Sequence, residues 1–373
     1  MNEQDYMRRA IALARRGVGW TAPNPMVGAV IVKDGRIIGE GWHKKCGELH
    51  AERNAIAALS ESAAGATIYV TLEPCCHYGR TPPCTEAILE QGISRVVIGS
   101  GDPNPLVAGK GAAMLRAHGV TVEEGFLREE CDALNPVFFH YITTRRPYVV
   151  MKYAMTLDGK IAAWTGASKW ITGSEARQHV QRLRGQYAAI LAGIGTVLAD
   201  DPMLNCRIDG AHQPLRIVVD STLRIPMSCR LVQTAREYPT LVACAQADPE
   251  KLALLEAAGL EVLCIPDGRG RVDLSALMEQ LGSRSVDSVL VEGGGEIHAS
   301  ALRAGIVSHV CAYIAPKLLG GRDAKTPIEG PGADSPDHGT QLQNLQITEL
   351  GPDLLLEYDV KRRELNGTCL QGS

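Results

Sequence analysis

The residues with the clearest chemistry lie in the first quarter of the chain and have the types and spacing of zinc ligands. Glu52 lies two residues after His50, and Cys84 lies nine residues after Cys75. Zinc prefers tetrahedral nitrogen and sulfur ligands, and a catalytic site leaves the fourth position to water. Glu52 would move a proton from that water to a leaving amine, as the glutamate of H-x-E does in zinc nucleobase deaminases. The pattern predicts a hydrolytic site in which His50, Cys75 and Cys84 hold one zinc ion.

The alternative interpretations are a structural zinc site, with Cys76 or His77 as the fourth ligand, and unrelated core thiols beside a histidine that caps a helix. Adjacent side chains seldom reach one metal, and neither alternative gives Glu52 a role, so we favour the catalytic interpretation. The spacing differs from the PC-x-x-C form of many deaminases, because eight residues separate Cys75 from Cys84. We expect each of the three ligands to lie at or just before a helix start, where the helix dipole favours a thiolate.

A second motif lies in the other half, where three glycines at 293–295 follow a strand-like run at 288–292. The backbone N–H groups of such a turn, at the start of a helix predicted over 296–303, can bind phosphate. The motif is not the G-x-G-x-x-G fingerprint. An ordinary tight turn between a strand and a helix is an equal alternative.

The elements that must position these residues form two α/β patterns, and Asp34-Gly35 is a strong hairpin signal in the first of them. The first pattern comprises helix 3–16, strands 27–33 and 36–40, helix 50–59, strand 67–72, helix 85–91, strand 94–100, helix 110–118 and strand 120–123. The second comprises strands 148–155, 188–194, 215–220, 240–245, 261–265, 288–292 and 309–315, helices 174–184 and 250–258, and a final hairpin over 345–358.

A helix over 126–141 and a polar linker over 143–147 are expected between the two patterns. The two patterns and the linker between them predict a deaminase domain over 1–145 and a second domain over 146–360. The remaining residues, 361–373, have little apolar content, and we expect a disordered tail.

Composition excludes several classes of protein. The net charge of −4 over 373 residues argues against a nucleic-acid partner. The longest apolar stretch, 187–199, is 13 residues long, short of the ~20 needed to cross a bilayer. The polar N-terminus has no secretory signal, and three of the eleven cysteines fall within 75–84, which fits metal binding in a reducing compartment. We expect a cytoplasmic protein without a membrane partner.

Longer motifs give a resemblance to a known family. They are TAPNPMVG (21–28), GDPNP (101–105), KYAMTLDGK (152–160), WIT (170–172), LADDP (198–202), VEGGG (291–295) and APKLLG (315–320). With the long segment between Cys75 and Cys84, they resemble the bifunctional riboflavin-biosynthesis deaminase/reductase family over about residues 5–360. One departure is Cys76, where the family more often has serine.

The resemblance implies an α/β fold, with a cytidine-deaminase-like domain followed by a dihydrofolate-reductase-like domain. It implies two activities on a phosphorylated pyrimidine. The first removes an amine from a diaminopyrimidinone ribosylamine phosphate, and the second uses NADPH to reduce the ribosyl group to ribityl. It places these residues in the deaminase pocket: Asn24, His43, His77, Arg80, Asp102 and Asn104.

For the second half, the resemblance assigns NADPH to Ala154, Trp170, Thr196, Asp200, Ser221, Gly294, Gly295, Glu296, Ile297, His298, Ala299 and Ser300. It assigns the substrate to Ser168, Arg184, Leu204, Arg207 and Glu292. Arg184 and Arg207 suit a phosphate because guanidinium binds it bidentately. Lys152 and Glu292 are expected to polarise or protonate the ring-opened sugar, with a structural Lys–Glu ion pair as the alternative. Ser221 and Arg224 are weak candidates for the 2′-phosphate that distinguishes NADPH from NADH.

Other functions remain as alternatives: an editing deaminase acting on tRNA, a deaminase of free guanine or cytidine, and a scaffold with one inactive half. The reductase-like half argues against the first two, and the complete zinc motif argues against the third. We also expect a homo-oligomer. The histidines His179, His212, His298 and His309 show no ligand spacing, and we interpret them as surface or core residues.

Overall fold

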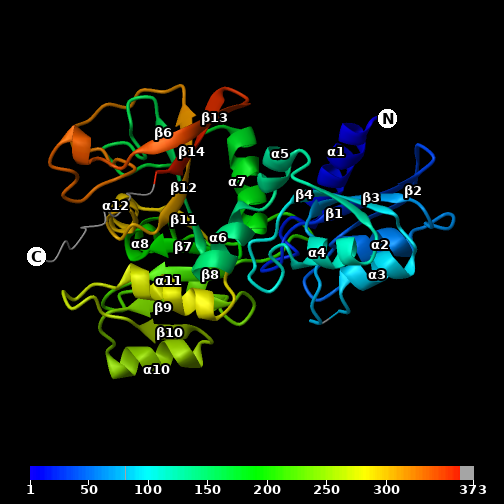
Figure 1. Ribbon diagram of the computed structural model, residues 1–373. Helices are drawn as coiled ribbons and strands as arrows, with labels where there is room; N and C mark the ends of the chain where they lie inside the picture. The colour runs from blue at the N-terminus through cyan, green and yellow to red at the C-terminus, as the bar shows by residue number, and fades with distance from the viewer. Residues whose placement is uncertain (80, 362–373) are drawn as a thin grey trace, which may run out of the picture.

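The computed structural model describes residues 1–79 and 81–361, which form two α/β units. Figure 1 shows the first unit, in blue to cyan, beside the larger second unit. Arg80 and nearly all of the predicted tail lie outside the described residues. Within those residues, no helix is both long and apolar enough to cross a membrane.

The first unit is a five-stranded sheet in the order β2-β1-β3-β4-β5. The strands are β1 (Gly28–Lys33), β2 (Arg36–Trp42), β3 (Thr67–Leu72), β4 (Arg95–Ser100) and β5 (Thr121–Glu124). The Asp34-Gly35 hairpin is confirmed, since φ is 48° at Asp34 and 72° at Gly35. Both residues therefore have the positive φ that a type I′ turn requires. Strands β3, β4 and β5 are parallel, and their carboxyl ends meet at one edge of the sheet.

Helices cover both faces of this sheet, because successive side chains of a strand point to opposite faces and nearly all those of β3 and β4 are buried. Ile68 and Val70 of β3 pack with α2 (Ala51–Ala57), α3 (Cys84–Glu90) and α4 (Lys110–Ala117). Tyr69, between them, packs on the opposite face with α1 (Glu3–Ala14) and α5 (Arg128–Asp132).

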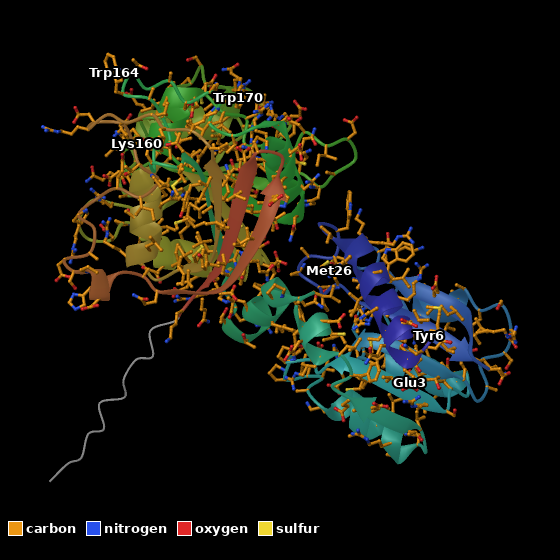
Figure 2. The ribbon with its side chains drawn as sticks, turned by 90° about the horizontal axis from the view of Figure 1, so that it is seen from above. Glu3, Tyr6, Met26, Lys160, Trp164 and Trp170 are labelled. Atoms are coloured by element: carbon orange, nitrogen blue, oxygen red, sulfur yellow. The ribbon has the colours of Figure 1, made fainter. Side chains whose placement is uncertain are left out.

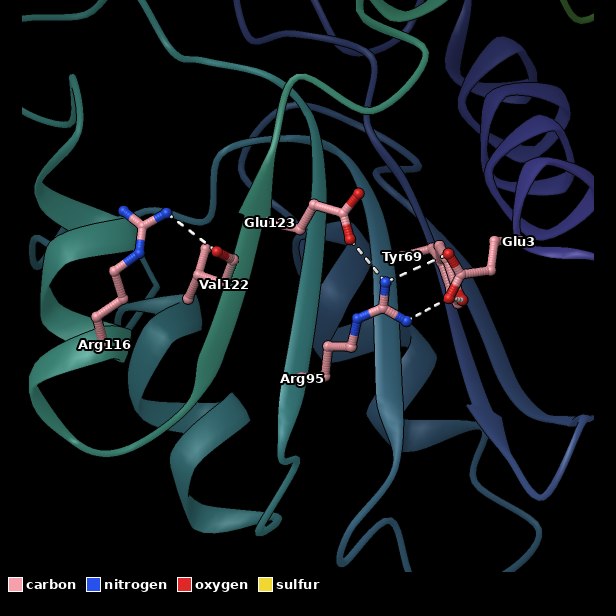
Figure 3. A network of polar contacts seen from close by, with 6 residues as sticks. All are labelled: Glu3, Tyr69, Arg95, Arg116, Val122 and Glu123. Atoms are coloured by element: carbon pink, nitrogen blue, oxygen red, sulfur yellow. Dashed lines mark hydrogen bonds and ion pairs between the residues drawn. The ribbon is translucent and has the colours of Figure 1, made fainter.

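Arg95 ties the start of α1 to the edge of the sheet (Figure 3). Its guanidinium contacts Glu3 through both terminal nitrogens and donates to Glu123 Oε2 at 2.6 Å. Tyr69 donates its hydroxyl proton to the same Glu3 carboxylate at 3.2 Å. The acidic side chains are about half exposed, so we expect each pair to stabilise the fold by no more than about 1 kcal/mol.

The second unit is a nine-stranded sheet in the order β10-β9-β8-β7-β11-β6-β12-β14-β13. Its strands are β6 (Tyr148–Thr156), β7 (Ala189–Gly193), β8 (Leu215–Val219), β9 (Thr240–Cys244), β10 (Glu261–Cys264), β11 (Ser288–Gly293), β12 (Val307–Ala315), β13 (Leu342–Leu350) and β14 (Asp353–Val360). Seven of these strands are parallel, and the last hairpin, β13–β14, adds to them antiparallel. Among the described residues, the second unit also has six α-helices: α7 (Ser174–Gln186), α8 (Ile194–Asp200), α9 (Arg230–Gln233), α10 (Pro249–Ala257), α11 (Leu274–Ser283) and α12 (Gly295–Arg303).

The single helix expected over 126–141 is wrong. The chain forms α5 and then a separate helix, α6 (Pro136–Thr144). Pro136 begins α6, and a proline has no N–H to continue the hydrogen bonds of a preceding helix, so the break falls before it. The next element is β6, which starts at Tyr148.

The two units meet around a cavity of about 380 Å³. Met26 lines it from the first unit, and Tyr148 and His309 line it from the second. Figure 2 shows Met26 at this junction. Close by, Tyr141 donates its hydroxyl proton to the carbonyl oxygen of Gly282 at 3.0 Å, which links α6 to α11.

Candidate active sites

The three predicted zinc ligands converge at one edge of the first sheet. Their ligand atoms all lie within 4.8 Å of one another. The His50 Nδ1 atom is 3.5 Å from the sulfur of Cys75 and 3.5 Å from the sulfur of Cys84. One nitrogen and two sulfurs at these separations fit a tetrahedral zinc ion with one position left for water.

Local structure explains how the ligands are held. His50 is the N-cap of α2 and Cys84 is the first residue of α3. Cys75 differs from the expectation that every ligand lies at a helix start, since it lies in a loop three residues after β3 ends. Its sulfur instead accepts the backbone N–H of Cys84 at 3.3 Å, so α3 stabilises the Cys75 thiolate from a distance along the chain.

Electrostatics favour a thiolate in this cluster. Hydrogen bonds from Cys84 and His50 lower the pKa of Cys75 to about 4, against the opposing effect of burial. Because the two sulfurs share one proton, the pKa of Cys84 is raised. A bound dication would displace that remaining proton, since thiolate is the form that ligates metal.

Glu52 lies in the first turn of α2, two residues after His50, and is 3% exposed. Burial and the nearby Cys75 sulfur raise the pKa of its carboxyl group. A carboxyl group with a raised pKa beside a water site can hold and release a proton near neutral pH.

Asn24 and His43 lie together beside the zinc ligands. The Asn24 Nδ2 atom is 3.4 Å from His43 Nε2, and the His43 ring makes an edge contact with His50 at 5.3 Å between ring centres. His43 is buried, its Nδ1 is 3.1 Å from the Leu49 carbonyl oxygen, and burial lowers its pKa. A neutral His43 that donates to Leu49 leaves its other nitrogen as an acceptor for Asn24.

His77 and Asp102 come from two different loops. Burial raises the pKa of Asp102 to about 6, with further contributions from the charges of Glu73 and Cys75. The buried His77 Nδ1 atom has no hydrogen-bond partner among the described residues. Asp102 accepts the backbone N–H of Asn104 at 2.8 Å, which shapes the loop. An unpartnered nitrogen next to a carboxyl group suits a polar ligand.

Sequence reasoning missed Glu73, which is 5% exposed. Its carboxylate accepts the backbone N–H of Gly109 at 2.9 Å and of Ala112 at 3.1 Å, across the start of α4. It thereby links the end of β3 to the loop that carries Asp102. The signal available in the sequence was its position, two residues before the ligand Cys75.

We expect Glu73→Ala to lower the free energy of unfolding by about 1–3 kcal/mol, because two backbone amides, one of them buried, lose their acceptor. Denaturant unfolding would measure this. Glu86→Ala is the matched control, since the Glu86 carboxylate accepts from the exposed Tyr78 hydroxyl. Equal stability of the two variants would contradict the role of Glu73.

In the second unit the structure pairs Glu292 with Arg184. Arg184 donates through Nε at 2.7 Å and through Nη2 at 2.6 Å to the two carboxylate oxygens. Burial alone would raise the pKa of Glu292, but Arg184 and Lys152 outweigh it and lower the pKa to about 2. Burial lowers the pKa of Lys152. The structure therefore pairs Glu292 with Arg184 and not, as the alternative interpretation expected, with Lys152. Lys152 has no ion pair within the described residues.

The remaining residues of the predicted substrate set lie at different depths. Leu204 is 2% exposed and belongs to the core. Arg207 is exposed, and its charge contributes to the low pKa of Glu292. Ser168 donates to Asp200 Oδ1 at 3.4 Å, which joins one substrate candidate to one cofactor candidate.

The cofactor candidates gather at the carboxyl ends of the parallel strands. Thr196 lies in α8 after β7, with its hydroxyl about 3.5 Å from where a Cβ of Gly294 would stand. Gly294 is the N-cap of α12, whose first N–H groups have no partner within the helix. The side chains of Ile297 and Ala299 are buried, so these two candidates can offer a phosphate only their backbone N–H groups.

Two other candidates lie at the surface. Trp170 is 59% exposed and packs its ring against the guanidinium of Arg177, and Figure 2 shows it at the end of the second unit far from Met26. Arg224 is 59% exposed, 3.5 Å from the Asp220 carboxylate.

Comparisons with known proteins agree with this arrangement. The cytidine and deoxycytidylate deaminase zinc-binding region matches residues 1–100, and the RibD C-terminal domain matches residues 147–356. The riboflavin biosynthesis protein RibD of Actinobacillus pleuropneumoniae is 58% identical over 361 residues, 96% of each chain. The chain belongs to the RibD family. The RibD of Escherichia coli K12 is 43% identical over 95% of this chain and 99% of its own.

Solved structures of RibD proteins have the same fold. One is RibD of Acinetobacter baumannii, with a TM-score of 0.86 and 38% identity over 96% of this chain and 99% of that one. Another is a diaminohydroxyphosphoribosylaminopyrimidine deaminase/5-amino-6-(5-phosphoribosylamino)uracil reductase of Thermotoga maritima. It has a TM-score of 0.83 and 37% identity over 96% and 98% of the two chains. The predicted family and fold class are confirmed.

RibD membership brings two cofactors, Zn²⁺ and NADPH, and the residues present fit both. The nitrogen and two sulfurs of the first unit are a zinc donor set. In the second unit, a glycine turn, a helix start and the Thr196 hydroxyl offer donors to a dinucleotide phosphate.

Proposed function

We propose that this chain performs two consecutive steps of riboflavin biosynthesis. The first unit deaminates 2,5-diamino-6-ribosylamino-4(3H)-pyrimidinone 5′-phosphate to the corresponding 5-aminouracil. The second reduces its ribosyl group to ribityl. The observation that carries the proposal is the buried Glu52 beside a three-ligand zinc cluster, in a chain that matches RibD proteins over 95% or more of its length.

In the deaminase site, His50, Cys75 and Cys84 would hold zinc, which would supply a water of lowered pKa. Glu52 would move a proton from water to the exocyclic amine, which would leave as ammonia. We propose that Asn24 binds the pyrimidine ring, because its amide offers both a donor and an acceptor. His77 and Asp102 would orient the substrate from the opposite loops, with Arg80 and Asn104 completing the predicted pocket.

In the reductase site, NADPH supplies a hydride. Lys152 is our candidate for the group that protonates the ring-opened sugar, since burial has lowered its pKa and it has no ion-pair partner among the residues that the structure describes. Arg184 holds Glu292 in place through hydrogen bonds from Nε and Nη2. These two donors are therefore not available for a bidentate contact with a phosphate. We therefore propose that the exposed Arg207 is the principal partner of the substrate phosphate.

We propose the same domain limits as the sequence suggested, 1–145 and 146–360. The short segment between the end of α6 at Thr144 and the start of β6 at Tyr148 supports them. The homo-oligomer and the cytoplasmic location stay predictions.

One reaction series tests both activities. The zinc-loaded protein is incubated with the diaminopyrimidinone ribosylamine 5′-phosphate, with and without NADPH, and products are followed by mass spectrometry. We expect replacement of an amine by oxygen without NADPH, and addition of a hydride and a proton with it. Loss of the second step alone would remove the reductase assignment, and absence of both would overturn the substrate. A parallel gel-shift assay with tRNA should show no complex.

A further inference from the structure

A second set of metal-ligating side chains lies in the second unit, and none of its members belongs to either candidate active site. One of them, Cys311, is the neighbour of Lys152 in the sheet register. His309, Cys311 and Glu357 bring a nitrogen, a sulfur and an oxygen within 4.8 Å of one another. His309 and Cys311 are two residues apart on β12, so their side chains share one face of the sheet. Glu357 of β14 pairs directly with Cys311 in the sheet register. The cluster is therefore built across two adjacent strands.

The distances suit a small ion. Glu357 Oε1 is 3.7 Å from His309 Nε2 and 3.7 Å from Cys311 Sγ. Zinc bonds of 2.0–2.3 Å at tetrahedral angles place neighbouring ligand atoms about 3.3–3.7 Å apart. The deaminase ligands, with their nitrogen–sulfur distances of 3.5 Å, are spaced in nearly the same way.

A neighbouring carboxylate orients the imidazole as metal sites require. Asp359 Oδ1 lies 2.9 Å from His309 Nδ1, and Asn344 donates to the other oxygen of Asp359 at 3.0 Å. When Nδ1 donates its proton to Asp359, the Nε2 lone pair faces Cys311 and Glu357. Carboxylate–histidine pairs of this kind fix the tautomer of zinc-bound histidines.

We propose that His309, Cys311 and Glu357 bind a divalent zinc ion, in addition to the zinc of the deaminase site. One nitrogen, one sulfur and one oxygen donor suit this borderline-soft ion. His309 also lines the cavity between the two units, which leaves a fourth position for water. The ion would crosslink β12 to the β13–β14 hairpin where the units meet. The proposal does not depend on the proposed function, because neither active site contributes a ligand.

Zinc content tests the proposal. The full-length protein is loaded with a small excess of Zn²⁺, desalted, and its zinc per chain is measured by mass spectrometry of the element. We expect two zinc ions per chain in the wild type and one in His309→Ala and in Cys311→Ala. The matched control is Cys229→Ala, since Cys229 is a buried thiol of the same unit outside the cluster, and it should keep both.

A second measurement detects the cysteine ligand directly, so that a loss of zinc caused by poor folding is not mistaken for the loss of a ligand. Co²⁺ is added to protein whose deaminase site already holds zinc, and thiolate-to-cobalt absorption in the near ultraviolet is recorded. We expect the band in the wild type and its loss in Cys311→Ala. Asp359→Asn keeps all three ligands and should weaken Co²⁺ binding by roughly 10–100-fold. One zinc per chain in the wild type, or an unchanged band in Cys311→Ala, would overturn the proposal and leave a His309 ion pair with Glu357 and Asp359.

Discussion

Replacing Glu52 with glutamine should lower deaminase turnover by about 10²–10⁴-fold, the usual contribution of a general acid/base. Glutamine has nearly the same shape but can neither take a proton from the zinc-activated water nor give one to the leaving amine. Glu52 is 3% exposed, so bulk water cannot easily replace it as a proton carrier. Single-turnover assays of ammonia release would measure the effect.

The same preparation provides the controls for this variant. Zinc content should be unchanged, because His50, Cys75 and Cys84 remain, and reduction of independently prepared aminouracil substrate should keep its rate. Glu61→Gln is a matched substitution in the same unit, at an exposed residue that pairs with Arg36, and it should have full activity. Full deaminase turnover in the Glu52 variant would disprove the role of this carboxylate.

Replacing Glu292 with glutamine should strongly destabilise the second unit. Arg184 has a side chain only 14% exposed, and the substitution leaves its charge without a counterion. Breaking a buried pair in this way costs about 3–5 kcal/mol. Denaturant unfolding would measure the loss, and we expect reductase activity to fall with it because Lys152 also loses its neighbouring charge. Glu279→Gln, at an exposed pair with Arg146, should cost less than about 1 kcal/mol.

A double variant separates the pair from its surroundings. Arg184→Met combined with Glu292→Leu should cost less than the sum of the single changes, because no unpaired charge remains buried. Additive losses would show that the two side chains act independently.

The Arg184–Glu292 pair also predicts that the stability of the second unit depends on pH in the acid range. The pKa of Glu292 is lowered to about 2 from an ordinary value of 4.5. Its stabilising effect is therefore complete above the ordinary value and is lost as pH falls towards 2. The stability difference between wild type and Glu292→Gln should narrow over that interval. A constant difference would contradict the shift.

Some features of this protein follow from short stretches of sequence. The Asp34-Gly35 turn, the His50–Glu52 spacing and the cysteine ligands were recognised from residue types alone, and the structure brings the ligands together as expected. These signals are local: a two-residue turn requires positive φ, and a zinc ion accepts few ligand types. Longer motifs also identified the family, because many residues had to match at once.

Local signals failed where one residue changed the outcome. The helix expected over 126–141 breaks before Pro136, since apolar periodicity continues across a residue that cannot donate its N–H. Cys75 was expected at a helix start, but its sulfur receives the N–H of a helix nine residues further along.

Only the tertiary structure decided which distant residues meet. Arg184 and Glu292 are 108 positions apart, yet they form a bidentate pair, and the pairing leaves Lys152 without the partner considered for it. From the sequence, His309 was interpreted as an ordinary surface or core residue. Glu357, which the structure places beside it, lies on another strand and far along the chain. Such contacts depend on strand order and register, which are set by the packing of whole sheets and leave no fixed spacing along the chain.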